Sequence, residues 1–252
     1  NHIGKTLSEW DTRFIPKVIS LMKDSSYLRV LGGRPLLYVF GAIDAGYFGN
    51  KNGITEANEL QKFKEAITRL RTAGNQSGLN PYIVWMYTNE NTTRQELGLD
   101  ALGGYTMSSH TTVHNQPYNN LLSDNVSRWA TLESSGAPYI PTLNVGWDYR
   151  PKLARARNSG MLGATYLPAT TQELENAFRT LISYVENHKA TIPSQTALIY
   201  AWNEYAEGGW LSPMWQGGNE RLDTLRLVRN NPIPVPPSIT PINRPDIIQL
   251  RL

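Results

Sequence analysis

The sequence contains no cysteine, which excludes disulfide bridges, a thiolate nucleophile and a cysteine-ligated zinc site. A membrane-spanning helix needs about 18 or more consecutive apolar residues, and the sequence has no apolar run of that length. Neither sign of charge dominates, because 24 Lys and Arg stand against 21 Asp and Glu, for a formal net charge of +3. The basic residues are scattered, which is not typical of nucleic-acid binding. We therefore expect an uncharged partner, no nucleic acid and no membrane span.

Several motifs of common enzyme classes are missing as well. The chain has no Gly-x-Ser-x-Gly nucleophile elbow, no Walker phosphate loop and no Gly-x-Gly-x-x-Gly dinucleotide fingerprint. His110 and His114 have the spacing of two metal ligands on a helix, but the segment "SHTTVHN" is a poor helix and lacks the Glu of a zincin motif. We expect no metal site and no organic cofactor. What the chain does have is 7 Trp and 13 Tyr, whose flat amphipathic rings suit sugar faces as well as protein cores.

A β-type run is followed by a helix-type run five times along the chain. The predicted strands are residues 34–40, 81–87, 101–107, 139–147 and 197–205. The helices predicted after them are 56–74, a weak one near 92–98, 118–136, 170–188 and 219–230. A further helix is predicted at 8–24, before the first strand. Apolar strands that alternate with helices indicate a parallel sheet covered by helices.

Polar residues follow directly after these strands, where the loops of a (β/α)8 TIM barrel build an active site. An open doubly wound sheet would bring them together less well. We therefore predict a TIM barrel of which residues 1–230 form the later strands, about five βα units. The earlier strands would be supplied by another segment. Residues 231–252 are rich in proline and are predicted to be a linker or the start of a further module.

Two carboxylates, Glu204 and Glu207, come just where the last apolar run stops. A pair of carboxylates flanking a glycosidic bond is the usual apparatus of glycoside hydrolysis. On an extended strand side chains three residues apart point to opposite faces, so the chain must turn between the two, and Gly208 with Gly209 permits a turn there. The alternative is a solvated loop pair or a structural salt bridge, for example to Arg221.

The segment "AWNEYAEGGWLSP" (201–213) resembles the Asn-Glu-aromatic-x-Glu-Gly signature of glycoside hydrolase family 99 and its WbsX-like relatives. The stretches "GRPLLYVF" (33–40) and "GWDYRP" (146–151) are similar to two further stretches of that group, in the same chain order. The resemblance covers roughly residues 8–230. One departure is visible, because Ser212-Pro213 stands where relatives commonly have Glu-Pro, and this bears on substrate identity more than on the reaction type.

The resemblance implies a (β/α)8 barrel that acts on, or is associated with, mannose-type and other bacterial polysaccharides. It also implies that Glu204 is the base that assists attack by the sugar's own 2-hydroxyl, giving retention through an epoxide-like intermediate. Glu207 would be the general acid/base and, lying nearer Trp210, is expected to be the drier of the two. In these relatives the "GRPLLYVF"-like strand lies in the middle of the barrel.

We expect the substrate-binding residues to line one concave mouth with the two acids. They are Asp44, Tyr87, Glu90, His110, Trp147, Asp148, Trp202, Asn203, Tyr205 and Trp210. Two of them have a plain structural alternative. His110 is as well suited to a hydrogen bond within its own Ser- and Thr-rich loop, and Asp148 to an internal ion pair with Arg150.

The function that these residues predict is a retaining, endo-acting glycoside hydrolase on a mannose-containing or related polysaccharide. Two alternatives use the same cleft. One is a non-catalytic carbohydrate-binding or polysaccharide-assembly barrel, and the other is a barrel that transfers sugars in surface-polysaccharide synthesis. A polysaccharide partner further suggests a secreted, periplasmic or cell-surface location.

Overall fold

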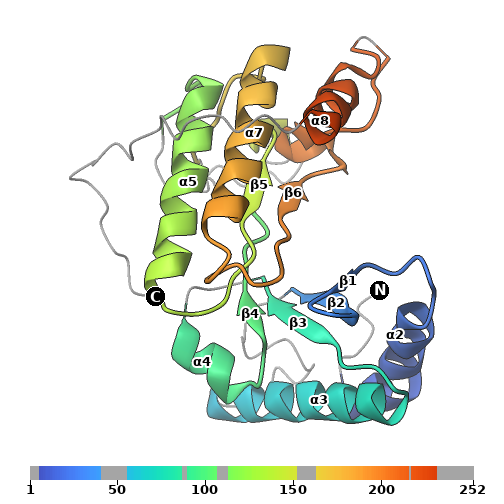
Figure 1. The fold of residues 1–252 in the computed structure, drawn as a ribbon. Helices are drawn as coiled ribbons and strands as arrows, with labels where there is room; N and C mark the ends of the chain where they lie inside the picture. Colours follow the sequence, from blue (N-terminus) through green and yellow to red (C-terminus); the bar gives the residue numbers. More distant parts are fainter. Residues whose placement is uncertain are drawn as a thin grey trace. The chain divides into compact units, whose positions relative to one another are not determined.

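The computed structural model describes residues 6–40, 56–86, 90–106, 113–151, 163–215 and 217–231, and its ribbon is drawn in Figure 1. The described residues fall into two compact units. The first comprises those up to Tyr105 together with segments 131–141 and 188–197. The second comprises those of 106–130, of 142–187 and from 198 onward. The predicted linker lies outside the described residues except for Asn231, so the domain boundary near residue 230 stays a prediction.

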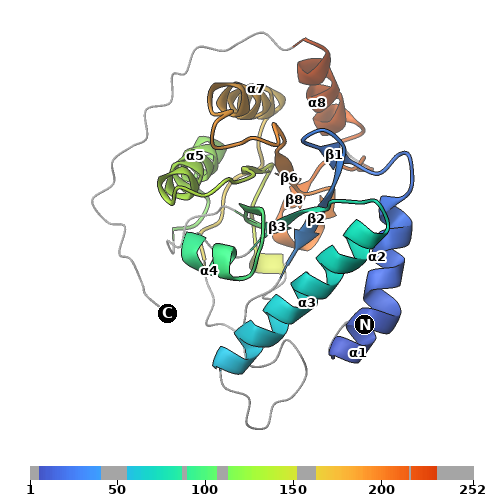
Figure 2. The ribbon, with the colours of Figure 1, turned by 60° about the horizontal axis from the view of Figure 1, so that its bottom comes forward.

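The first unit begins with the helix that the sequence predicts. It has three parts: α1 (Leu7–Glu9), the π-helical η1 (Trp10–Phe14) and α2 (Ile15–Met22). Pro16 lacks an N–H and so cannot donate to the regular ladder, and the N–H of Ile15 bonds the carbonyl of Trp10 in the wider π turn. The buried Trp10 indole donates to the carbonyl of Ala66 at 2.7 Å, which fixes this start to α3 (Glu56–Gln76). Figure 2 shows α2 and α3 lying side by side.

The sheet of the first unit has the order β1-β2-β3-β4. Strands β2 (Arg34–Val39), β3 (Tyr82–Trp85) and β4 (Ala101–Leu102) are parallel. They match the first three predicted strands, and α4 (Asn91–Glu96) matches the weak helix. The fully buried residues of β3 explain its continuous apolar run. Strand β1 (Arg29–Val30), antiparallel to β2, was not predicted.

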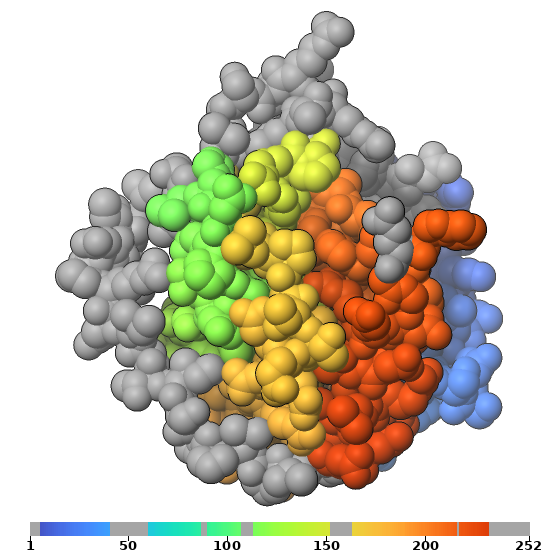
Figure 3. All heavy atoms as spheres, turned by 90° about the horizontal axis from the view of Figure 1, so that it is seen from above, coloured from blue at the N-terminus to red at the C-terminus, as the bar shows by residue number. Residues whose placement is uncertain are grey.

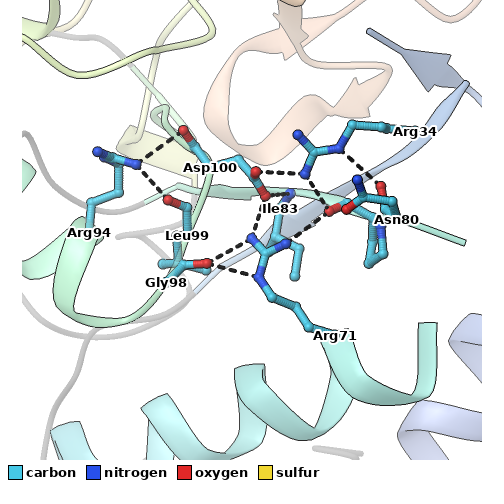
Figure 4. Close-up of polar contacts among 9 residues, drawn as sticks. Arg34, Arg71, Asn80, Ile83, Arg94, Gly98, Leu99 and Asp100 are labelled. Atoms are coloured by element: carbon cyan, nitrogen blue, oxygen red, sulfur yellow. Dashed lines mark hydrogen bonds and ion pairs between the residues drawn. The ribbon is translucent and has the colours of Figure 1, made fainter. Parts of the chain in front are cut away.

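A cluster of three arginines surrounds Asp100 at the amino ends of these parallel strands (Figure 4). Arg34 donates to one carboxylate oxygen of Asp100 at 2.6 Å. The guanidinium of Arg71, from α3, and the backbone N–H of Ile83, at 2.9 Å, donate to the other oxygen. Arg94 donates to the Asp100 backbone carbonyl at 3.2 Å. Because amino-terminal strand ends carry stability rather than catalysis in βα folds, we interpret this cluster as structural.

The second unit has a parallel pair, β5 (Thr142–Asn144) and β6 (Leu198–Tyr200), which match the last two predicted strands. Its helices α5 (Tyr118–Ser134), α7 (Thr171–Asn187) and α8 (Glu220–Asn230) lie side by side in Figure 3. The end of α5, from residue 131, belongs to the first unit. A Thr-x-x-Glu capping box opens α7: the backbone N–H of Thr170 donates to the Glu173 carboxylate at 2.9 Å, and the backbone N–H of Glu173 donates to the Thr170 hydroxyl at 3.2 Å.

Helix α5 holds β5 by three buried hydrogen bonds. The Tyr118 hydroxyl donates to the carbonyl of Asn144 at 2.9 Å, and the Trp129 indole donates to the carbonyl of Thr142 at 2.8 Å. The amide oxygen of Asn125 accepts from the N–H of Asn144 at 2.6 Å. These buried bonds fix the strand whose carboxyl end leads into the loop at 145–150.

The predicted alternation of β and α elements is confirmed in a mixed α/β fold, because the described parallel strands β2 to β6 are followed in turn by helices α3, α4, α5, α7 and α8. Within the part of the chain that the structure describes, the parallel strands form two separate sheets and no closed barrel. The complete (β/α)8 barrel therefore stays a prediction.

Candidate functional site

The two acids lie on a tight hairpin that follows β6 in the second unit. Strand β7 (Asn203–Glu204) pairs antiparallel with β8 (Gly209–Trp210), so that Glu204 lies opposite Gly209. A single 3-10 turn, η2 (Tyr205–Glu207), joins them and ends at Gly208 in the left-handed conformation, with φ of 75°. The chain reversal that two carboxylates three residues apart require is thus present between Glu204 and Glu207.

Burial distinguishes the two carboxylates. Glu207 is buried, with 5% of its surface exposed, whereas Glu204 is half-buried. The hydroxyl of Tyr200, the last residue of β6, donates to the Glu207 carboxylate. The Glu207 backbone carbonyl accepts the N–H of Asp148 at 2.8 Å. The expectation that Glu207 is the drier acid agrees with this burial.

Glycine is required where the hairpin packs against the loop after β5. A Cβ on Gly146 would lie 2.1 Å from the carbonyl oxygen of Gly208. A Cβ on Gly208 would lie 2.5 Å from the backbone nitrogen of Asp148, and one on Gly209 would lie 2.8 Å from the Tyr200 ring. The backbones of the segments "GWDYRP" and "NEYAEGG" therefore pack directly against each other. This contact gives a physical reason for the glycines in both.

Arg221, from α8, supports the same loops through their backbone. Its guanidinium donates to the carbonyls of Trp210 at 2.8 Å and Val145 at 3.0 Å, and it lies 4.2 Å from the centre of the Trp210 ring. Burial lowers the pKa of Arg221. Arg221 thus bonds main-chain oxygens, whereas the alternative expectation was a salt bridge from Arg221 to Glu204 or Glu207.

Asp148 and Arg150 form the ion pair that the sequence left open as an alternative. Arg150 donates to the two Asp148 oxygens at 2.9 and 2.7 Å and to the amide oxygen of Asn115 at 3.0 Å. The hydrogen bonds from Arg150 hold the pKa of Asp148 below its usual range. Asp148 thus shapes its own loop, while its backbone N–H holds the hairpin.

Two aromatic side chains at the hairpin are exposed, whereas Trp10, Trp85 and Trp129 are buried. Trp202 and Tyr205 are 55% and 47% exposed, and Asn203 is exposed between them. The Tyr205 and Trp210 rings lie 6.3 Å apart at a tilt. Trp147 is half-buried, with its ring 5.8 Å from that of Tyr200. Exposed rings beside the acids can stack on sugar faces.

Four predicted site residues remain, and their place beside the hairpin stays a prediction: Asp44, Tyr87, Glu90 and His110. Glu90 lies in the first unit, exposed at the N-cap of α4, where it accepts the Thr93 hydroxyl at 3.1 Å. Asp44, Tyr87 and His110 lie outside the described residues, so their place in the site stays a prediction. Among the described side chains, no group of three His, Asp or Glu could hold a metal ion. Of the helices described, none has the length and apolar character to span a membrane.

One residue that sequence reasoning missed is Tyr200. It is the buried last residue of β6, inside the predicted strand 197–205. Its hydroxyl could have signalled a role, because a buried Tyr needs a polar partner and the nearest acids in the sequence are Glu204 and Glu207.

Comparison with known proteins places these residues in a family context. The family model described as "Glycosyltransferase WbsX" matches residues 5–225. Curated relatives include "Uncharacterized protein WxcX" from two strains of Xanthomonas campestris pv. campestris, each 27% identical over 230 residues. Each alignment covers 86% of this chain and 30% of the relative, so the chain spans less than a third of the relatives' length.

Similar solved structures include two of a glycoside hydrolase family 99 endo-alpha-mannosidase from Bacteroides thetaiotaomicron. Both are 13% identical to this chain. The structure in complex with BIS-TRIS-Propane has a TM-score of 0.47, and the match covers 86% of this chain and 62% of that one. The second has a TM-score of 0.45, and the match covers 86% of this chain and 60% of that one.

Proposed function

The chain belongs to the carbohydrate-active family described as glycosyltransferase WbsX, and we propose that it cleaves glycosidic bonds with retention through Glu204 and Glu207. The observation that carries this proposal is the β7–η2–β8 hairpin. It places two acids one turn apart, beside exposed aromatic rings and at the carboxyl end of a parallel strand.

In the proposed first step, Glu204 takes the proton of the sugar's 2-hydroxyl while that oxygen attacks the anomeric carbon. The bond from the anomeric carbon to the leaving oxygen breaks, and Glu207 gives its proton to that oxygen. In the second step Glu207 removes a proton from water, which attacks the anomeric carbon and opens the epoxide-like ring, and Glu204 returns a proton to the 2-oxygen. Two inversions give net retention.

The different surroundings of the two acids support these separate roles. Glu207 is buried and its backbone is held by Asp148, which suits a group that must hold and deliver one proton in a fixed direction. Glu204 is half-buried at the end of β7, which suits a base that must reach a substrate hydroxyl.

The substrate that we propose is a mannose-containing or related polysaccharide cut within the chain. The motif from Asn203 to Gly208 is the basis for the mannose-type sugar. The exposed Trp202 and Tyr205 favour a polymer, because separate rings can stack on successive sugars. A secreted, periplasmic or cell-surface location is proposed on the same ground.

Transfer of the sugar to another hydroxyl is the second candidate, and the family description favours it. In this version an acceptor sugar's hydroxyl replaces water in the second step, with Glu207 again as the base. The protein would then extend or remodel a surface polysaccharide instead of degrading it.

The test is product analysis with the full-length protein on a polysaccharide panel that includes α-mannans, with and without added acceptor oligosaccharides. Glu204→Gln and Glu207→Gln should each lower turnover by about 100-fold or more, with polysaccharide binding largely retained. Glu186→Gln, an exposed position on α7, is the matched control and should be unchanged. Near-normal turnover in either acid variant removes that residue from the mechanism. Binding without cleavage or transfer in the wild type would instead support a non-catalytic barrel.

A further inference from the structure

A tyrosine outside the sequence motif contacts one of the two acids directly. The Tyr200 hydroxyl donates a hydrogen bond to the Glu207 carboxylate. Both residues are buried, with 2% and 5% of their surfaces exposed. They are seven residues apart in the chain, and the β7–η2–β8 hairpin brings them together. Away from water a hydrogen bond to a carboxylate is strong, so this contact restrains the direction of the Glu207 side chain.

The Tyr200 side chain is itself held on several sides. Gly209 packs so closely under its ring that a Cβ there would lie 2.8 Å from Cε1. The Trp147 ring lies 5.8 Å away, and the Tyr200 carbonyl accepts the N–H of Val145 at 2.9 Å. The phenol therefore cannot swing away from Glu207 unless the loops after β5 and β6 move.

We propose that Tyr200 is a positioning residue that aims the Glu207 carboxyl group at the leaving oxygen. The inference rests on the proposed function. The transferred proton comes from Glu207 and passes to the leaving oxygen as the bond to the anomeric carbon breaks, while the Tyr200 proton stays on its own oxygen. Tyr200 contributes orientation, and small errors in orientation cost much rate in proton transfer.

The experiment compares Tyr200→Phe with Tyr118→Phe in the full-length protein. Both remove one hydroxyl from a buried tyrosine of the second unit, and the Tyr118 hydroxyl donates to a backbone carbonyl instead of an acid. Tyr200→Phe should lower kcat on polysaccharide by about 10- to 100-fold with little change in KM. Tyr118→Phe should keep kcat within about 2-fold, although both variants lower the melting temperature by similar amounts.

The dependence of the cleavage rate on the leaving group distinguishes impaired proton donation from a general structural defect. Aryl glycosides with strongly activated leaving groups need little protonation. Tyr200→Phe should therefore keep a kcat/KM close to the wild-type value on them, because kcat/KM reports the step in which the leaving group departs, and Glu207→Gln should show the same pattern in kcat/KM with a larger loss on polysaccharide. In the Glu207→Gln background, the Tyr200→Phe change should have no further effect on kcat.

The outcomes separate this inference from the function on which it rests. If Glu207→Gln keeps its turnover, the proposed function fails. If Glu207→Gln is impaired but Tyr200→Phe is not, the function stands and the positioning role is overturned. Equal losses on activated and natural substrates in Tyr200→Phe, or additive losses in the double variant, likewise overturn it. A selective, non-additive loss supports it.

Discussion

Replacing Asp100 by Asn should destabilise the first unit strongly, because one carboxylate there serves three donors. Arg34, Arg71 and the N–H of Ile83 all donate to it. The Asp100 side chain is 17% exposed, and those of Arg34 and Arg71 are 22% and 25% exposed. Hydrogen bonds to a charged group are worth about 1.5–3 kcal/mol each, and breaking a buried ion pair costs about 3–5 kcal/mol.

Partial exposure and the oxygen that Asn retains reduce these values, so we expect a loss of about 3 kcal/mol in the free energy of unfolding. In a protein of this size that loss lowers the melting temperature by about 6–12 °C, and in a larger protein by less. The assay is urea unfolding followed by tryptophan fluorescence, since Trp85 on β3 is buried in the same unit.

The matched control is Asp223→Asn, which breaks an ion pair to Arg226 whose side chains are 53% and 62% exposed. Exposed pairs contribute less than about 1 kcal/mol, so this variant should unfold close to the wild type. A loss below about 1 kcal/mol for Asp100→Asn, or one equal to the control, would refute the structural interpretation of the arginine cluster.

Two further predictions concern the loops of the candidate site. Gly208→Ala should lower the free energy of unfolding by about 2 kcal/mol or more and impair turnover, because the residue has a φ of 75° and its new Cβ would lie 2.5 Å from the Asp148 nitrogen. The control is Gly217→Ala, which should be nearly neutral because its Cβ would meet nothing within 4 Å. Arg150→Met should raise the pKa of Asp148, measured by NMR titration of its carboxyl carbon. Since that pKa is lowered in the folded state, the ion pair's stabilisation is present above about pH 4 and is lost as pH falls through the folded value. An unchanged Asp148 titration would contradict this.

The sequence predicted the order of strands and helices because each described parallel strand is a run of apolar residues, and runs of that kind alternate visibly with helical patterns. It missed β1 because Arg29–Val30 is too short to show any period. It extended the last strand to Tyr205, whereas β6 ends at Tyr200 and a separate hairpin begins at Asn203. Both belong to one continuous stretch of strand-forming residues, so composition could not separate them.

The candidate site was predictable in its acids but not in what holds them. The carboxylates and the glycines form a local pattern in the sequence, and a turn between the two acids follows from the alternation of side chains along a strand. The contact of Gly146 with Gly208 and that of Tyr200 with Glu207 depend on how separate loops meet, and no local period encodes this.

The three-residue spacing of the acids gains a meaning from the hairpin. In a strand, Glu204 and Glu207 would face opposite ways. In a continuous helix they would share one face and one environment. A strand that ends in one 3-10 turn does neither, because it leaves the first acid half-buried at the strand end and carries the second into the protein against Tyr200. Two equal side chains thereby acquire different surroundings, which chemistry with one base and one acid requires. Any insertion between Glu204 and Glu207 should therefore abolish turnover even where the protein still folds and binds polysaccharide.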